Sequence, residues 1–419
     1  MQTLIAVIII FGLIVAIHEW GHLYFAKKMG ILCREFAIGF GPKLYSKKKN
    51  ETLYTIRLFP IGGFVRMAGE DPESVTIKPG YEIGLTFNDE DKVKEIIVNN
   101  KAKHPNAKIV SVERIDLEHE MMIEAYGDED EGLVRFEVDR QADLIVDEER
   151  DQLAPWDRQF GSKKPWQKAV AIFAGPLMNF VLAILLFVTY NVMEGVPVPI
   201  VDQVMEGSPA EDVGLAPGDE VLSINGEEIT SWGEMSETIQ SNPGEELSFH
   251  IERADSSQET ILISPDSIYQ EPLDEYFGQI GVVPQSEVSF MLVITDSFVK
   301  LWDVVELIAD VLSLIFTGEF SIDMLAGPVG IYDYTGEVVQ MGYEMLFFWA
   351  GILSVNIGIM NLLPIPALDG GRLVFIGLEA IRGKPLDPGK EGMAHFVGFA
   401  LLMLLVIMVT WNDITRLFL

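Results

Sequence analysis

The sequence predicts a polytopic α-helical membrane protein with four transmembrane helices, a β-rich insertion on the cytoplasmic side and a separate extracytoplasmic domain. Three observations lead to this prediction. The apolar residues are clumped into runs, the basic residues are concentrated between particular runs, and the intervening segments alternate polar and apolar residues as strands do. Because 49% of the 419 residues are hydrophobic and clumped, intrinsic disorder and a purely cytosolic enzyme are excluded.

The four apolar runs are long enough to cross a bilayer, since ~20 helical residues at ~1.5 Å each match a hydrocarbon core of ~30 Å. The first run lacks the basic start and the small-residue cleavage site of a signal peptide, so we expect it to be retained. The expected transmembrane helices, each extended into its flanking residues, cover 1–28, 167–193, 343–371 and 393–419.

The distribution of Lys and Arg orients these helices. Of the 30 basic residues, 23 lie between Lys27 and Lys168, whereas 194–285 contains only Arg253. Because basic loops stay on the cytoplasmic side, we expect 29–166 and the loop 372–392 to be cytoplasmic and both termini to lie outside the cell membrane.

Net charge and cysteine content exclude further classes. The formal charge is −33, so we expect no nucleic acid partner, because a polyanion would be repelled. A single cysteine, Cys33, cannot form an intrachain disulfide framework or a cysteine-based zinc site. The acidity itself fits either a saline or alkaline habitat or a trait of a subgroup.

A further apolar stretch lies within 287–342 but carries charges at spacings of 4, 3, 3 and 4 residues, which places them on one helical face. These are Asp296, Lys300, Asp303, Glu306 and Asp310. Five charges are costly in lipid, so we expect a membrane-associated amphipathic helix followed by a loop rather than a fifth span.

The segments between the apolar runs are predicted to form β structure. Residues 29–70 alternate around glycine-rich turns, which predicts a β-hairpin that lies on the cytoplasmic surface or dips into the membrane beside the first helix. Residues 71–166 are expected to form a β-rich insertion. Its acidic run 128–131 is expected to be a solvated turn.

Residues 194–286 form a separate domain by composition. The segment GSPAEDVGLAPGDEVLSINGEEITSW at 207–232 resembles a PDZ domain of the bacterial type, with a capped helix after Ser208, core positions at Leu215, Val221, Leu222 and Ile224, and an Asn225-Gly226 hairpin turn. The resemblance implies a domain that senses peptides or gates substrates by strand addition; a plain spacer is the alternative.

The first motif whose residues are suited to catalysis is HEWGH at 18–22. On a helix, His18 and His22 lie one turn apart on the same face, so both imidazoles can bind one Zn²⁺. Glu19 lies next to the metal and can act as a general base on water. Such polar groups are costly at the end of an apolar helix, which argues against two ordinary core histidines.

A catalytic zinc ion usually has three protein ligands, and Asp369 is the best candidate for the third. The charge distribution places Glu19 and Asp369 at the same membrane depth. Pro364 and Pro366 would open the helix before Asp369, which lets this carboxylate turn inward and leaves backbone groups unpaired near the site. The alternative is an Asp-Gly turn that merely ends a helix.

Together these motifs resemble the site-2 protease family of intramembrane zinc metalloproteases. The matching segments are HEWGH, FAGPLMNF at 173–180, the PDZ-like segment and NLLPIPALDGG at 361–371, in an order that covers essentially the whole chain. Within this family the chain most resembles the bacterial type that controls sigma-factor release (the RseP/RasP type). A single PDZ-like segment, together with the large cytoplasmic insertion, is similar to its Gram-positive subgroup.

The resemblance implies a Zn²⁺-dependent endopeptidase in the lipid bilayer. Its substrates would be single-pass membrane proteins such as anti-sigma factors or signal-peptide remnants, cut within the transmembrane segment after another protease has removed the outer domain. Because a helical peptide bond is shielded, the substrate must unwind. Asn361 and the backbone opened at Pro364 can bind the unwound segment; Asn179 can do the same or join helices.

Two other functions remain as alternatives. One is an inactive membrane-anchored receptor that binds peptides through its PDZ-like domain, although both HExxH and the aspartate are intact. The other is a metal transporter, but no internal repeat is visible. The remaining histidines show no comparable pattern, and we assign none of them a metal: His104, His119, His250 and His395.

Overall fold

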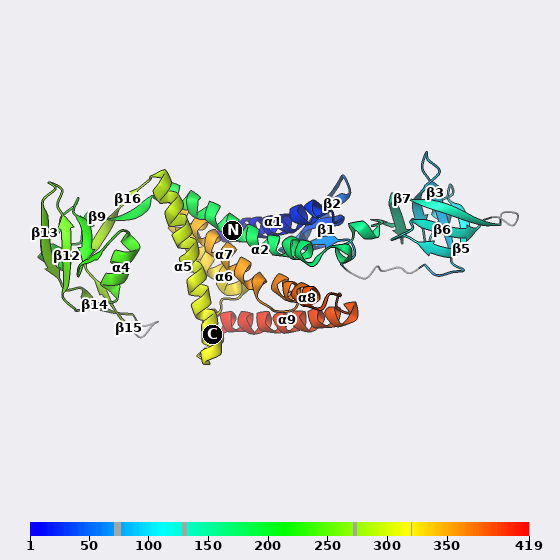
Figure 1. Ribbon diagram of the computed structural model, residues 1–419. Helices are drawn as coiled ribbons and strands as arrows, with labels where there is room; N and C mark the ends of the chain where they lie inside the picture. The colour runs from blue at the N-terminus through cyan, green and yellow to red at the C-terminus, as the bar shows by residue number, and fades with distance from the viewer. Residues whose placement is uncertain (71–76, 128–131, 271–274, 320, 419) are drawn as a thin grey trace. The chain divides into compact units, whose positions relative to one another are not determined.

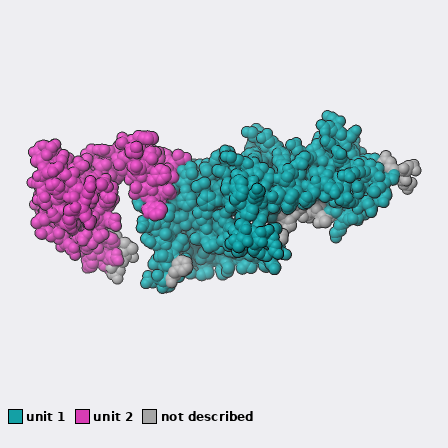
Figure 2. Space-filling model, in the orientation of Figure 1, with its two compact units in different colours: residues 1–183, 303–419 teal, residues 184–302 magenta. Residues whose placement is uncertain are grey.

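The computed structural model describes residues 1–70, 77–127, 132–270, 275–319 and 321–418 (Figure 1). The predicted turn at 128–131 lies outside these residues. The chain divides into two compact units (Figure 2). Unit 1 comprises Met1–Ala183 and Asp303–Leu419, and unit 2 comprises Ile184–Trp302.

Four helices among the described residues are long and apolar enough to cross a membrane, as the sequence predicts. Their mean hydropathy follows from runs of Leu, Ile, Val and Phe, with charges confined to the ends and to the HExxH segment. They are α1 (Gln2–Lys28), α2 (Pro165–Glu194), α7 (Tyr343–Leu362) and α9 (Pro388–Phe418).

Helix α8 (Asp369–Arg382) corrects the prediction for the third span and the loop after it. The span ends at Leu362 rather than at residue 371, and Asp369 starts a new helix that covers half of the predicted loop 372–392. Its polar side chains lie among apolar ones, so the segment has no long apolar run that would reveal a helix. Gly383, in the left-handed conformation with φ 69°, ends it.

The segment 287–342 is also more helical than predicted. Helix α5 (Phe290–Thr317) contains the predicted charged face, with an ion pair between Asp296 and Lys300. After the short 3₁₀ turn Ile322–Met324, helix α6 (Pro328–Met341) replaces the predicted loop. The buried carboxylate of Asp413 in α9 caps α6 by accepting hydrogen bonds from its N-terminal backbone amides. Helix α6 also packs against α1 and α7.

The predicted hairpin is formed by β1 (Cys33–Lys49) and β2 (Thr52–Met67), but both strands bend back on themselves. Glu35 pairs with Leu53 at the start of β2 and also with Arg66 near its end. Glycines with positive φ, among them Gly39 and Gly62, allow the bends. The first half of β1 is therefore central, and the end of β2, residues 63–67, lies at an edge of the sheet.

The insertion is a small barrel with the strand order β4-β3-β5-β6-β7-β8, closed by a parallel pairing of β4 with β7. Alternating apolar residues on its strands, such as Ile83, Leu85 and Ile123, fill its interior. The strands are β3 (Glu82–Phe87), β4 (Val93–Ile97), β5 (Lys108–Asp116), β6 (Met122–Tyr126), β7 (Leu133–Val146) and β8 (Glu149–Gln152).

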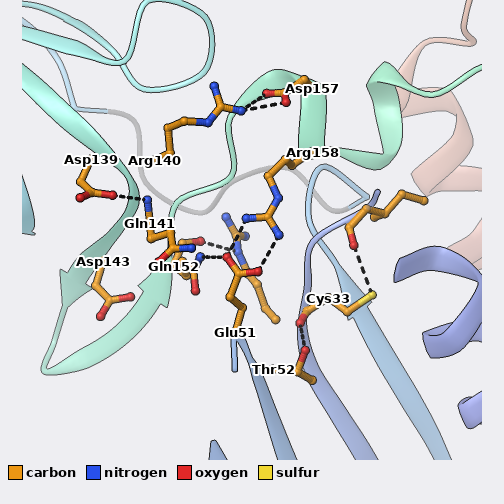
Figure 3. A network of polar contacts seen from close by, with 12 residues as sticks. Cys33, Glu51, Thr52, Asp139, Arg140, Gln141, Asp143, Gln152, Asp157 and Arg158 are labelled. Atoms are coloured by element: carbon orange, nitrogen blue, oxygen red, sulfur yellow. Dashed lines mark hydrogen bonds and ion pairs between the residues drawn. The ribbon is translucent and has the colours of Figure 1, made fainter. Parts of the chain in front are cut away.

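A polar network joins the hairpin to the end of the barrel (Figure 3). Glu51, at the hairpin tip, accepts two hydrogen bonds from Arg158 at 2.6 and 2.7 Å and one from Gln152. Hydrogen bonding to Arg158 lowers the pKa of Glu51 from 4.5 to about 2. Beside this network Cys33 is buried, and burial raises the pKa of its thiol to about 12, so it packs as a small apolar residue.

Unit 2 contains the sheet β13-β12-β10-β9-β16, with β11 paired to β10, and a separate β14-β15 hairpin. Ser208 caps α3 as predicted, and Asn225 and Gly226 both have positive φ, as a type I′ turn requires. Leu222 is only half-buried, unlike the other predicted core positions. The elements are β9 (Val196–Val204), α3 (Pro209–Asp212), β10 (Glu220–Ile224), β11 (Glu227–Glu228), α4 (Trp232–Gln240), β12 (Leu247–Glu252), β13 (Gln258–Ile263), β14 (Asp266–Gln270), β15 (Glu275–Gln279) and β16 (Val282–Glu287).

Candidate metal centre

The face of α1 that carries HExxH is pressed against α2. A Cβ atom added at Gly21 would lie 2.5 Å from the carbonyl oxygen of Ala174, and one added at Gly175 would lie 2.2 Å from Nε2 of His22. Two glycines therefore allow the helix backbones to approach closely. As a result His18, Glu19 and His22 are all buried, although each is polar.

Helix α2 also orients His22. The Nδ1 atom of His22 lies 2.9 Å from the carbonyl oxygen of Ala171, to which it can donate a hydrogen bond. Such a bond fixes the tautomer and leaves Nε2 with a free lone pair, the usual arrangement for a metal-binding histidine.

Asp369 reaches the two histidines because the chain between α7 and α8 folds very tightly. A Cβ atom at Gly370 would lie 2.2 Å from the carbonyl oxygens of Leu362 and Leu363, and one at Gly371 would lie 2.4 Å from that of Ile365. Only glycine fits at these positions. The two glycines therefore let α8 begin directly against the end of α7, with the carboxylate of Asp369 at its first position.

The three candidate ligand atoms form a nearly equilateral triangle. Nε2 of His18 lies 3.2 Å from Nε2 of His22, and Oδ2 of Asp369 lies 3.2 and 3.3 Å from these nitrogens. A tetrahedral zinc ion with ligands at ~2.0–2.1 Å would separate them by about 3.3 Å. Oδ2 is buried and has no hydrogen bond within the described part of the chain. These residues therefore fit a zinc ion and leave the fourth position open.

The triangle borders a cavity of about 440 Å³ that also contains Glu19 and Asn361. The edge of β2, residues 63–67, forms one wall of the cavity. At Gly63 this edge touches the general-base candidate, because an added Cβ atom would lie 2.8 Å from Cγ of Glu19. The arrangement brings a potential base, a potential metal site and an exposed strand edge into one space.

The three substrate-binding candidates have different positions. Asn361 lines the cavity, and its amide donates to the carbonyl oxygen of Ile357 at 3.1 Å. Pro364 lies in the tight turn after α7 and is not among the residues that line the cavity. Asn179 is fully buried, beside Gly358 of α7, and its side-chain amide has no hydrogen bond within the described residues.

An ion pair that the sequence does not predict joins Arg372 of α8 to Glu70, and both residues line the cavity. Arg372 follows Asp369 by three residues, a helical spacing that would have placed it on the same face had α8 been recognised. A second ion pair holds the far end of this helix, where Lys168 of α2 lies 2.8 Å from Glu379. These two pairs tie α8 to the hairpin region and to α2.

The sequence is similar to known proteins over its whole length. A sequence profile for peptidase family M50 matches residues 6–405. The chain belongs to peptidase family M50. It is 51% identical to "Zinc metalloprotease RasP" of Shouchella clausii (strain KSM-K16) over 421 residues, covering 100% of both chains. It is 50% identical to "Regulator of sigma-W protease RasP" of Bacillus subtilis (strain 168), covering 100% of this chain and 99% of the relative.

Family membership confirms the predicted activity: the protein is a zinc-dependent metalloendopeptidase of the site-2 protease type, in the plasma membrane, and Zn²⁺ is its cofactor. Among solved structures, the chain is similar to the PDZ domain of the SdrC-like protein Lin2157 from Listeria innocua. That match has 22% identity and a TM-score of 0.18, and it covers 23% of this chain and 98% of the other.

Proposed function

We propose that this metalloprotease holds its zinc ion with His18, His22 and Asp369 and uses Glu19 as the general base. The observation that carries this assignment is the triangle of ligand atoms with 3.2–3.3 Å edges, next to Glu19 in one cavity. When bound, zinc supplies a Lewis acid that polarises the scissile carbonyl and makes the attacking water more acidic. Glu19 accepts the proton from this water and then donates it to the leaving amine.

The substrate is an unwound transmembrane segment laid along the edge of β2. Residues 63–67 lie at the edge of their sheet, and backbone groups at such an edge pair with an added strand. Since Gly63 touches Glu19, a strand added there would carry its peptide bonds past the base. Asn361, which lines the same cavity, would bind the substrate backbone. In the structure the amide of Asn361 donates to the carbonyl oxygen of Ile357. In an α-helix this oxygen already accepts a backbone hydrogen bond.

Pro364 and Asn179 complete the proposed substrate-binding set. Pro364 contributes by breaking α7 after Leu362, which opens the turn that leads to Asp369. Asn179 has a buried amide without a partner among the described residues, so it forms no side-chain hydrogen bond between helices there. We propose that Asn179 becomes accessible only when α2 and α7 separate around a substrate.

The substrates we infer are single-pass membrane proteins of the anti-sigma-factor kind, and signal-peptide remnants, after a first protease has removed the outer domain. The name of the Bacillus subtilis relative, a regulator of sigma-W, supports this class. The charge distribution supports both termini and residues 194–286 outside the membrane, with the catalytic residues toward the cytoplasm.

We also propose that the PDZ-like domain restricts access to the site. It contributes no residue to the candidate ligand set, so its role would be to exclude substrates that still carry an outer domain. Deletion of 200–285 should leave cleavage of a pre-trimmed substrate intact and permit cleavage of an untrimmed one. Loss of all cleavage by a folded deletion variant would refute the gating role.

The assignment of Glu19 is tested by Glu19→Gln. This variant should keep about one equivalent of zinc and lose cleavage of a model transmembrane substrate, because the metal ligands remain while the base is removed. His22→Ala should lose both zinc and cleavage. A Glu19→Gln variant with full turnover would exclude Glu19 as the base. Absence of turnover in the zinc-loaded parent would instead favour the receptor alternative.

A further inference from the structure

The turn between α7 and α8 contains a strained residue close to the candidate metal ligands. Ala367 has φ 82°, in the left-handed region that residues with a Cβ atom rarely adopt. It lies two residues before Asp369 and lines the same cavity. Such a conformation persists only where surrounding contacts hold it, so the contacts of Ala367 determine where α8 and its carboxylate begin.

The contact that holds Ala367 comes from α9. Its backbone N–H donates a hydrogen bond to Nδ1 of His395 at 2.9 Å. One turn further along α9, Gly398 lies directly against the same turn, because an added Cβ atom would be 2.1 Å from the carbonyl oxygen of Pro366. The backbone of α9 thus abuts the residues that lead into Asp369.

The ring of His395 also contacts α8 itself. Its centroid lies 5.5 Å from that of Phe375 in an edge-on arrangement. Because a backbone N–H can only donate, Nδ1 of His395 must accept, and the ring proton is on Nε2. Nε2 lies 3.8 Å from Oε1 of Glu391, one turn earlier on α9, which favours this tautomer.

We propose that His395 is a positioning residue for the zinc site. It touches none of the candidate ligands. By holding Ala367 in its left-handed conformation, it sets the position of the Asp369 carboxylate relative to His18 and His22. This inference rests on the proposed function, in which Asp369 is a zinc ligand. The last transmembrane helix thereby becomes part of the support of the metal centre.

The test is a set of substitutions at His395 in the full-length protein in detergent, with zinc affinity measured by competition with a chelator. In His395→Asn the amide oxygen can occupy the place of Nδ1 and accept the same hydrogen bond, whereas His395→Leu cannot accept one. We expect His395→Leu to weaken zinc binding 10- to 100-fold, the range found when a supporting partner of a metal ligand is lost. His395→Asn should stay within about threefold of the parent.

Two further variants separate positioning from general damage to the fold. Phe396→Leu, at a neighbouring exposed position of α9, should leave zinc affinity unchanged. Ala367→Gly combined with His395→Leu should recover most of the lost affinity, because glycine adopts φ 82° without strain. Equal zinc affinity in the Leu and Asn variants, or no recovery in the double variant, would overturn the proposal.

Asp369→Ala distinguishes this inference from the assignment on which it rests. Loss of zinc from Asp369→Ala, together with full affinity in His395→Leu, would refute only the role of His395. Full zinc affinity in Asp369→Ala would instead refute the ligand assignment, and the positioning role with it. Thermal unfolding of the zinc-free forms should be alike for the parent, the Asn variant and the Phe396→Leu control.

Discussion

Gly175→Ala is the substitution for which the structure gives the clearest quantitative expectation. The added methyl group would lie 2.2 Å from Nε2 of His22 and 2.5 Å from its Cε1. An ordinary contact between such atoms is about 3.5 Å, so either the imidazole or helix α2 must move by about 1.3 Å. The nearest atom, Nε2 of His22, is the one that we assign to the metal.

Either movement should damage the site. If the ring moves, it leaves the carbonyl oxygen of Ala171 and the triangle with His18 and Asp369. If α2 moves, the close packing at Gly21 opens. A misplacement of about 1 Å near reacting groups costs on the order of 10²-fold in rate. We therefore expect Gly175→Ala to lose about 10²-fold in turnover and to bind zinc more weakly.

The assay compares turnover of a fluorescent transmembrane substrate and zinc content for the parent, Gly175→Ala and Gly12→Ala. Gly12 is the matched control, because it lies in α1 and an added Cβ atom there has no neighbour within 4 Å. It should retain parental turnover. Parental zinc content and turnover in Gly175→Ala would refute the close packing of α2 against the metal-binding face of α1.

Three further predictions concern Glu51 in the hairpin turn, Gly63 at the sheet edge and Asn361 in the cavity. The hydrogen bonds from Arg158 lower the pKa of Glu51 to about 2 in the folded protein, against 4.5 in the unfolded chain. The contribution of the Glu51 carboxylate to the free energy of unfolding is therefore complete above about pH 4.5 and is lost as the pH falls toward 2. Thermal unfolding of Glu51→Gln should lack this part of the acid dependence; an unchanged dependence would contradict the assignment. Gly63→Ala should cut turnover on the order of 10²-fold with zinc retained, because its methyl group would lie 2.7 Å from the carbonyl oxygen of Ala37 and 2.8 Å from Cγ of Glu19, so that β2 and the base are forced apart. Parental turnover would contradict this contact. Asn361→Leu should reduce turnover about tenfold, the equivalent of one hydrogen bond, with zinc content and thermal stability unchanged. A loss of stability instead would assign Asn361 to helix packing.

The candidate ligand set could be predicted from the sequence because its signals are local. The four-residue spacing of His18 and His22 depends only on the helix repeat, and the depth of Asp369 followed from the distribution of charges along the chain. The apolar runs likewise predicted all four long helices, since a bilayer leaves few alternatives for such runs.

What could not be predicted depends on contacts between distant segments. The roles of Gly63 and Gly175 appear only when β2 and α2 are packed against α1. The sequence does not predict helix α8, because its mixed polarity resembles a loop beside longer apolar runs. His395 showed no pattern because its partner, the backbone of Ala367, lies 28 residues away and has no side-chain signature.

The barrel inserted between the hairpin and α2 illustrates the same limit. Its strands were predicted from alternation, but their closure through β4 and β7 requires a parallel pairing between residues some 45 positions apart. Its attachment to the hairpin depends on Glu51 and Arg158, which the sequence separates by 107 residues. The barrel end is therefore joined to the hairpin by hydrogen bonds between side chains that no local sequence pattern connects.

The most direct test of the central claim is X-ray absorption at the zinc edge of the purified protein. We predict a first shell of two imidazole nitrogens and carboxylate oxygen at ~2.0–2.1 Å, with no sulfur. Asp369→Ala should remove the carboxylate oxygen and lower zinc content. A sulfur ligand, a third imidazole, or an unchanged first shell in Asp369→Ala would contradict the assignment of His18, His22 and Asp369 as the zinc ligands.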